Sequence, residues 1–202
     1  FCRAEGYNAY LYAPKDDPYQ REKWREPYPA AKLSELGALV KAAKAQDVRF
    51  IFAVSPGLDV SLHGYKGYAD RQKMIAKLET LYALGVRDFA IFFDDIKDKD
   101  GAGQAAFLSD VARELKQRHD DIGSFLTVPT EYFYADMQAD GVRKPYTDAF
   151  AKGLSPDILV LYTGDGVAKG PLTDEALARA EALYGRELGI WWNYPVNDYM
   201  ES

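Results

Sequence analysis

The sequence has 202 residues, of which 48% are hydrophobic, so it can bury one substantial core, and we expect a single domain over residues 1–202. The formal net charge is -6, and basic side chains are scattered among acidic ones. This pattern excludes nucleic acid and anionic membrane surfaces as natural partners. The single cysteine and two histidines show no metal-ligand spacing, and no apolar run approaches the roughly 20 residues that span a bilayer. We therefore expect no cofactor and no membrane insertion.

The chain begins with a segment that predicts the end of a helix. Residues 1–6 are typical of a last helical turn, and Gly6 is the residue type that ends such turns. Because residue 1 is Phe rather than Met, we expect that a preceding segment is missing. Secretion and a cytoplasmic location therefore stay equally open, and so does the oligomeric state.

Short β-rich runs alternate with helical patterns along the chain. The predicted strands are residues 8–13, 49–55, 89–94, 124–129, 158–163 and 188–193. Apolar residues three and four positions apart predict helices around residues 33–40, 74–82, 107–115 and 177–183. This order predicts an α/β fold of the (β/α)8 TIM-barrel type with about six βα units, two short of a closed barrel. An open doubly wound sheet is the alternative, but no Gly-x-Gly-x-x-Gly follows the first strand.

Polar residues follow each predicted strand directly, as they do where a barrel assembles an active site. The third strand ends in the adjacent acids Asp94 and Asp95. Two carboxylates in a partly desolvated site do not both ionise cheaply, so one can stay anionic while the other holds a proton. Glycoside hydrolysis requires this division of tasks. For an isolated Asp-Asp pair, however, a helix cap or a solvated loop is the commoner interpretation.

Five motifs change that balance because they occur together and in a fixed order between residues 10 and 199. They are Tyr-Leu-Tyr-Ala-Pro-Lys-Asp-Asp-Pro-Tyr with Lys-Trp-Arg-Glu-Pro-Tyr, Phe-Ala-Val-Ser-Pro-Gly-Leu-Asp, Phe-Asp-Asp-Ile, Thr-Val-Pro-Thr-Glu-Tyr, and Trp-Trp-Asn-Tyr-Pro-Val-Asn-Asp-Tyr. With these motifs the sequence closely resembles the catalytic domain of glycoside hydrolase family 84, the O-GlcNAcase family.

The resemblance implies a retaining exo-β-N-acetylglucosaminidase that works by substrate-assisted catalysis. In this mechanism the acetamide oxygen of the substrate attacks the anomeric carbon and an oxazoline intermediate forms. Asp94 would hold the acetamide N–H and stabilise that intermediate, and Asp95 would be the general acid and later the general base. Terminal or O-linked N-acetylglucosamine on glycoproteins or glycans would be the substrate. The sequence alone does not distinguish protein O-GlcNAc from host glycans.

The same resemblance assigns five substrate-binding residues. Lys15 and Asp198 would contact sugar hydroxyls, as would Asn193. Tyr132 would line the acetamide pocket, and Trp191 would give the pocket an apolar face. Without the resemblance, each of these residues is equally or better explained as a loop, turn or core residue.

Other expectations concern the neighbours of these motifs. Alternation along a strand points Trp192 away from Trp191, which makes Trp192 the likelier packing residue. His63 and His119 lie in polar segments and are expected to be exposed. The segment Tyr-Thr-Gly-Asp-Gly-Val at residues 162–167 departs from the Trp-Thr-Gly-Pro that is usual in the family, which predicts an altered loop near the pocket.

The family's first and eighth strands have no counterpart within these residues. The sequence therefore predicts an incomplete barrel, with unpaired strand edges and poor activity of the isolated 202-residue chain. Two alternatives to a full hydrolase stay open. One is a catalytically weak carbohydrate-binding protein. The other is a metal-dependent barrel enzyme in which the two adjacent acids ligate a divalent cation.

Overall fold

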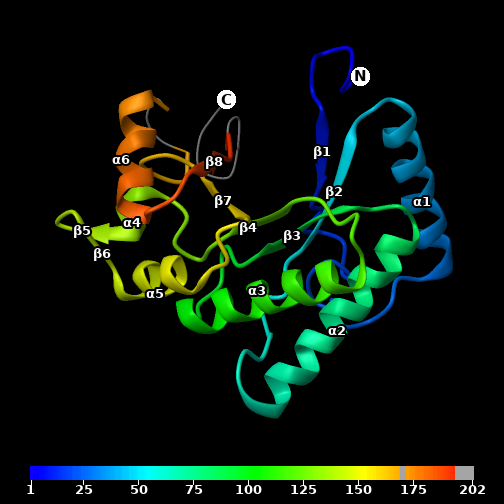
Figure 1. Cartoon of the computed structure of the whole chain (residues 1–202), viewed down its shortest axis with the longest axis horizontal. Coiled ribbons are helices and arrows are strands. Elements are labelled where there is room, and N and C mark those ends of the chain that lie inside the picture. Colours follow the sequence, from blue (N-terminus) through cyan, green and yellow to red (C-terminus); the bar gives the residue numbers. More distant parts are fainter. Residues whose placement is uncertain (169–171, 194–202) are drawn as a thin grey trace. The chain divides into compact units, whose positions relative to one another are not determined.

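The computed structural model describes residues 1–168 and 172–193 (Figure 1). The chain divides into two compact units, the first formed by Phe1–Phe92 and Phe107–Phe125 and the second by Phe93–Ala106 and Leu126–Ser202. We describe each unit by itself, and the single domain stays a prediction. No helix within the described ranges combines the length and the apolar character needed to cross a membrane.

The first unit is built on three parallel strands. They are β1 (Ala9–Tyr12), β2 (Arg49–Val54) and β3 (Asp88–Phe92). Ala9 lies opposite Arg49 in the β1–β2 pair, and Ile51 lies opposite Asp88 in the β2–β3 pair. Every residue of β3 is buried, which explains why this strand shows no alternation of polar and apolar residues.

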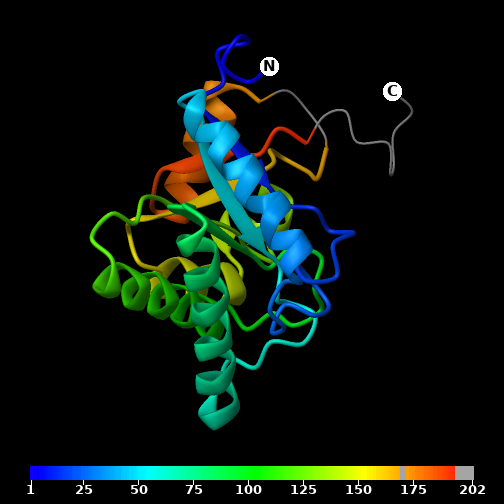
Figure 2. The same cartoon turned by 90° about the vertical axis from the view of Figure 1, so that its right-hand side faces the viewer.

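Helices pack beside these strands. The bounds of the helices are α1 (Ala30–Ala45), α2 (Gly64–Ala83) and α3 (Gly101–Arg118), of which α3 contributes residues to both units. Figure 2 shows α1 running along β2. The buried face of α2 carries Met74, Leu78 and Leu81 at helical spacing, and Gly85 follows the helix at φ 104°. The predicted helix around residues 74–82 is therefore confirmed, with its glycine stop.

The N-terminal turn has the geometry that its sequence predicts. Gly6 adopts φ 82°, its N–H donates to the Arg3 carbonyl at 3.2 Å, and the N–H of Tyr7 donates to the Cys2 carbonyl at 2.8 Å. This pair of bonds is the Schellman arrangement found at helix C-termini. Glycine is needed here because a side chain would be strained at this positive φ.

The second unit contains the later strands and a short insertion between them. Its strands are β4 (Phe125–Val128), whose first residue belongs to the first unit, β7 (Ile158–Tyr162) and β8 (Leu188–Ile190), in that order in the sheet. The insertion consists of α4 (Tyr134–Met137), the hairpin β5 (Gln138–Ala139) and β6 (Val142–Arg143), and α5 (Pro145–Gly153). The last helix, α6 (Asp174–Tyr184), begins at the N-cap Thr173 and ends at Gly185, which has φ 80°.

All six predicted strands are present within the described residues, and with their connecting helices they confirm an α/β fold of incomplete TIM-barrel type. The insertion was not predicted. Its strands have two residues each and α4 has four, too few for a hydrophobic period to be visible. The helix α5 has nine residues, and its buried face includes the polar residue Thr147 beside Tyr146 and Phe150.

Candidate functional site

The two adjacent acids lie at the carboxyl end of β3, in unlike environments. The N–H of Phe93 donates to the Val128 carbonyl at 2.8 Å, which extends the pairing of the strands up to the acids. Asp94 is buried, with 7% of its surface exposed, whereas Asp95 is exposed and has φ 56°. This left-handed conformation is uncommon for a residue with a side chain, and Asp is among the few types that tolerate it. Residue burial therefore distinguishes the two acids, and their separate tasks stay a prediction.

Tyr132 lies next to the exposed acid. It is half-buried in the segment after β4, and its hydroxyl donates to Asp95 Oδ1 at 3.3 Å. The ring of Phe133 meets the Tyr132 ring edge-on, with the centroids 5.5 Å apart. The structure thus brings together two of the residues that the sequence singles out, from segments 37 positions apart.

A buried hydrogen-bond network fixes the backbone just before the acids. Thr130 Oγ1 donates to the Phe93 carbonyl at 2.9 Å. The hydroxyl of Tyr146 accepts a bond from the Thr130 N–H at 2.8 Å and donates to Gln104 Oε1 at 2.6 Å. Burial raises the pKa of Tyr146 above its usual value, which keeps this phenol protonated and able to donate. The carbonyl that precedes Asp94 is therefore bonded by Thr130, which follows β4, and Thr130 is held in turn by Tyr146 of α5 and Gln104 of α3.

A second cluster surrounds Glu131, which is buried directly before Tyr132. Lys99 Nζ lies 2.9 Å from Glu131 Oε1, and Thr147 Oγ1 donates to Glu131 Oε2 at 2.6 Å. Lys99 also lies 3.4 Å from Asp136, which in turn pairs with Lys144 at 3.0 Å. Burial alone would lower the pKa of Lys99, but its hydrogen bond to Glu131 and the charges of both acids raise it overall. Both lysines thus serve as cations for buried or half-buried carboxylates.

Residues 162–167, at the end of β7 and after it, contact the segment that carries Tyr132. The N–H of Thr163 donates to the Tyr132 carbonyl at 3.1 Å, and the Tyr134 N–H donates to the Gly164 carbonyl at 2.9 Å. Asp165, which stands where relatives usually have Pro, forms an ion pair of 2.6 Å with Arg179 of α6. The altered loop near the pocket stays a prediction, and Asp165 provides an ion pair that proline could not form.

The residues after β8 are described as far as residue 193. The Trp191 N–H donates to the Tyr162 carbonyl at 2.8 Å, and Asn193 Nδ2 donates to the Val167 carbonyl at 3.1 Å. Trp191 is half-buried, whereas Trp192 is 63% exposed. The expectation that Trp192 is a packing residue is therefore wrong for the described structure. Asp198 lies outside the described residues.

Lys15 belongs to the first unit, where it follows β1 and is half-buried. The loop that contains it is supported by Lys77 of α2, whose Nζ donates to the Tyr19 carbonyl at 2.8 Å.

His119, expected to be exposed, is half-buried instead. It bonds Glu79 at 2.7 Å and stacks on Tyr82 at 3.8 Å between ring centroids.

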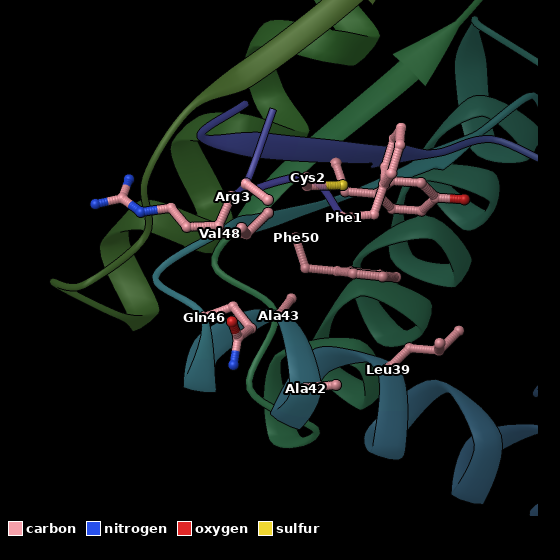
Figure 3. A pocket seen from close by; sticks show the side chains of 11 residues that line it. Phe1, Cys2, Arg3, Leu39, Ala42, Ala43, Gln46, Val48 and Phe50 are labelled. Carbon is pink, nitrogen blue, oxygen red and sulfur yellow. The ribbon is translucent and has the colours of Figure 1, made fainter. Parts of the chain in front are cut away.

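The first unit also contains an apolar hollow of about 530 Å³ between the N-terminal turn, α1 and β2. Figure 3 shows Phe1, Leu39 and Phe50 around it. None of the site residues predicted from the sequence lines this hollow. Within the described ranges, no group of three or more His, Cys, Asp or Glu side chains is placed to hold a metal ion.

Sequence reasoning missed the polar residues that are buried near the acids or paired with them. The motif Thr-Val-Pro-Thr-Glu-Tyr contains Thr130 and Glu131, but only its tyrosine was given a role. Gln104 and Lys99 lie outside every motif. A buried acid such as Glu131 cannot be recognised from sequence, because glutamate is usually exposed and its burial depends on partners distant in the chain.

The chain is similar to known proteins over nearly its whole length. The family model described as beta-N-acetylglucosaminidase matches residues 1–202. The mouse and rat proteins named Protein O-GlcNAcase are each 33% identical over 199 residues, which cover 95% of this chain and 21% of theirs. This chain thus spans about a fifth of the length of these curated relatives.

Two solved structures have the same fold. CpGH84B is 45% identical with a TM-score of 0.93, and the match covers 96% of this chain and 35% of that one. A variant of the O-GlcNAc hydrolase of Thermobaculum terrenum is 30% identical with a TM-score of 0.86, over 98% of this chain and 43% of that one. Similarity at this level extends over nearly all of the present sequence.

Proposed function

We propose that this chain, which belongs to the beta-N-acetylglucosaminidase family (glycoside hydrolase family 84), removes terminal β-linked N-acetylglucosamine from glycoconjugates. The observation that carries the proposal is the pair at the end of β3. Asp94 is buried, and Asp95 is exposed and accepts a hydrogen bond from Tyr132 at 3.3 Å. The two acids thus have unlike surroundings, and their separate tasks are proposed from the family motif in which they occur.

In the proposed mechanism the enzyme supplies no nucleophile. The acetamide oxygen of the bound sugar attacks the anomeric carbon, and the bond from that carbon to the leaving oxygen breaks as Asp95 transfers its proton to the oxygen. Asp94, as an anion, accepts a bond from the acetamide N–H and stabilises the positive charge that develops on the oxazoline. Asp95 then takes a proton from water, which attacks the anomeric carbon and restores the acetamide with net retention.

The remaining site residues are proposed to bind the sugar. The half-buried Tyr132 places an aromatic ring and one hydroxyl beside Asp95, which suits the wall of an acetamide pocket. Trp191 and Asn193 would contribute an apolar face and polar contacts from the segment after β8. Lys15 and Asp198 would bind sugar hydroxyls. The proposal for Asp198 rests on its motif alone, since this residue lies outside the described range.

The substrate class follows from the same family membership. The mammalian relatives are named as O-GlcNAcases that act on protein, and the bacterial structure is named as an O-GlcNAc hydrolase. We propose that glycoproteins or glycans bearing terminal N-acetylglucosamine are the substrates of this chain. Both names support O-linked N-acetylglucosamine as the sugar, and the family description supports its β-linkage.

The first test replaces the proposed proton donor. Asp95→Asn keeps the shape of the side chain and removes its proton, so turnover of N-acetylglucosaminides with poor leaving groups should fall at least about 100-fold. Activated aryl glycosides, which depart with little protonation, should be hydrolysed much better than the others. Steady-state kinetics of the natural protein with a series of aryl N-acetylglucosaminides measures both effects.

Asp140→Asn is the matched control. Asp140 is also an exposed aspartate at positive φ, 52°, but it lies in the turn of the β5–β6 hairpin. The same chemical change should leave kinetics unaltered at this position. Unchanged turnover by Asp95→Asn across the whole leaving-group series would refute the proposed role. Calorimetric binding of an oxazoline-like inhibitor without any hydrolysis would instead favour the carbohydrate-binding alternative.

A further inference from the structure

Glu131 is a buried carboxylate to which the proposed mechanism gives no task. Its side chain is 3% exposed, and it directly precedes Tyr132 in the chain. Burying a carboxylate away from water is expensive unless charged and hydrogen-bonding partners compensate for the lost hydration. The position of Glu131 must therefore be fixed by the groups that surround it.

Those groups come from two other segments of the same compact unit. Lys99, which pairs with Glu131 at 2.9 Å, lies four residues after Asp95 in the loop between β3 and α3. Thr147, which donates to the other carboxylate oxygen at 2.6 Å, is a fully buried residue of α5. One carboxylate thus joins the loop of the acids, the segment of Tyr132 and a helix.

We propose that Glu131 is a positioning residue: its buried carboxylate, paired with Lys99 and bonded by Thr147, holds the Tyr132 hydroxyl against Asp95. This inference rests on the proposed function of Asp95 as proton donor. The Tyr132–Asp95 bond is already long at 3.3 Å, so a small displacement of either segment would break it. A shift of about 1 Å in a reacting group can reduce a rate about 100-fold.

The charged groups around Glu131 distinguish this role from that of an ordinary surface ion pair. Lys99 also reaches Asp136 at 3.4 Å, but Asp136 has a second cation, Lys144, at 3.0 Å. Loss of Lys99 therefore leaves Asp136 paired with Lys144. It removes the one cation that pairs with Glu131 among the described residues. The cluster supplies both a test residue and a matched control.

The test compares Glu131→Gln and Lys99→Met with the wild-type natural protein. For a substrate with a poor leaving group, we expect kcat to fall at least about tenfold while KM stays within about threefold. For an activated aryl N-acetylglucosaminide, which depends less on the proton of Asp95, kcat should change little. The basic limb of the kcat–pH profile should also move, because the acid loses a fixed hydrogen-bond partner. A residue that only supports folding would move neither the leaving-group dependence nor the pH profile.

Lys144→Met is the control, because it breaks the ion pair with Asp136 and leaves both partners of Glu131 in place. It should have wild-type kinetics, and Lys99→Arg, which keeps the charge, should restore most of the activity lost in Lys99→Met. If Glu131→Gln does not fold, the double variant Glu131→Gln/Lys99→Met removes both charges together and leaves no buried charge unpaired.

The outcomes separate this inference from the proposed function. Wild-type protein without hydrolase activity would overturn both. A second outcome would overturn the positioning role alone. In it, wild type is active and Asp95→Asn shows the expected loss, but Glu131→Gln and Lys99→Met leave the leaving-group dependence and the pH dependence of kcat unaltered. A selective loss on poor leaving groups, with rescue by Lys99→Arg, would establish it.

Discussion

Lys77 shows how a single buried residue can make folding depend on pH. It is 6% exposed on α2, its Nζ donates to the Tyr19 carbonyl at 2.8 Å, and it lies 4.4 Å from the centroid of the Tyr28 ring. Burial lowers its pKa to about 8, against the opposing effect of the charges of Asp17 and Glu26. The loop that carries Lys15 therefore rests on an amine that releases its proton in mildly alkaline solution.

The sign of the resulting pH dependence follows from proton uptake on unfolding. Between the folded pKa of about 8 and the ordinary lysine pKa of 10.5, the unfolded chain binds the proton and the folded chain does not. The contribution of Lys77 to the free energy of unfolding therefore increases as pH rises from about 8 to about 10. Above that range the raised pKa of buried tyrosines such as Tyr146 acts in the opposite direction.

Urea denaturation at pH 7, 8, 9 and 10 measures this contribution. The difference in free energy of unfolding between wild type and Lys77→Met should grow with pH, because the methionine has no proton to release. Lys73→Met, which alters an exposed lysine of the same helix, should show no such trend. Parallel curves for wild type and Lys77→Met would contradict the pKa shift.

At the scale of elements, the first turn of α3 is pressed against α5. A Cβ added at Gly101 would lie 2.3 Å from the Tyr146 carbonyl oxygen and 3.1 Å from the Phe150 nitrogen. Both are backbone atoms of α5, so one helix would have to move. The same helices carry Gln104 and Tyr146, whose hydrogen bond holds the network behind Asp94.

Gly101→Ala should therefore lower the free energy of unfolding by about 1–3 kcal/mol, the usual effect of overpacking. It should also reduce activity, because the network behind the acids would shift with the helix. The control is Gly37→Ala in α1, where the new Cβ would meet only Leu84 Cδ2 at an ordinary 3.6 Å. That variant should be as stable as wild type, or more stable by up to about 1 kcal/mol. Chemical denaturation of both variants checks the contrast.

The elements differ in how well the sequence predicts them. The strands can be predicted from the sequence because runs such as Phe-Ala-Ile-Phe are apolar throughout, as expected of strands buried on both faces. The helix α2 can be predicted because Met74, Leu78 and Leu81 repeat at helical spacing. At nine residues the helix α5 is too short to be recognised, although Tyr146 and Phe150 lie four positions apart on its buried face. The burial of Thr147 against Glu131 is not predictable either. A polar residue buried for a specific partner carries no periodic signal, and its partner lies elsewhere in the chain.

The site residues also differ in how well the sequence predicts them. Asp94, Asp95 and Tyr132 belong to motifs at strand ends, and the structure places Asp95 and Tyr132 within hydrogen-bond distance. Their support by Glu131, Lys99 and the Thr130 network depends on contacts between segments far apart in sequence. The roles of the site residues stay predictions, which the variants above are designed to test.

At the scale of the whole chain, the 202 residues carry a net charge of -6, which should act on charged substrates of the proposed hydrolase before they bind. A negative field repels acidic aglycones and attracts basic ones, and salt screens both effects over a distance of about 8–10 Å at physiological ionic strength. This field does not alter the encounter rate of a neutral sugar. The charge of the peptide or glycan around the N-acetylglucosamine should therefore alter the rate of productive encounter.

Glycopeptides that differ only in flanking charge test this effect. At low ionic strength kcat/KM should be lowest for the acidic peptide and highest for the basic one, and added salt should bring the values together. A neutral aryl N-acetylglucosaminide should give the same kcat/KM throughout. Equal salt dependence for all three substrates would show that the field of the molecule does not reach the binding step.

The backbone of Asp95 carries a consequence for how the sequence can change over time. At φ 56° glycine would fit with less strain, by roughly 1 kcal/mol, so stability alone favours the loss of this side chain. If Asp95 is the proton donor, selection for hydrolysis keeps it there despite this strain. In lineages that no longer process the sugar, this position should drift toward glycine before the buried Asp94 changes. Glycine or asparagine here would then mark relatives that have become binding proteins.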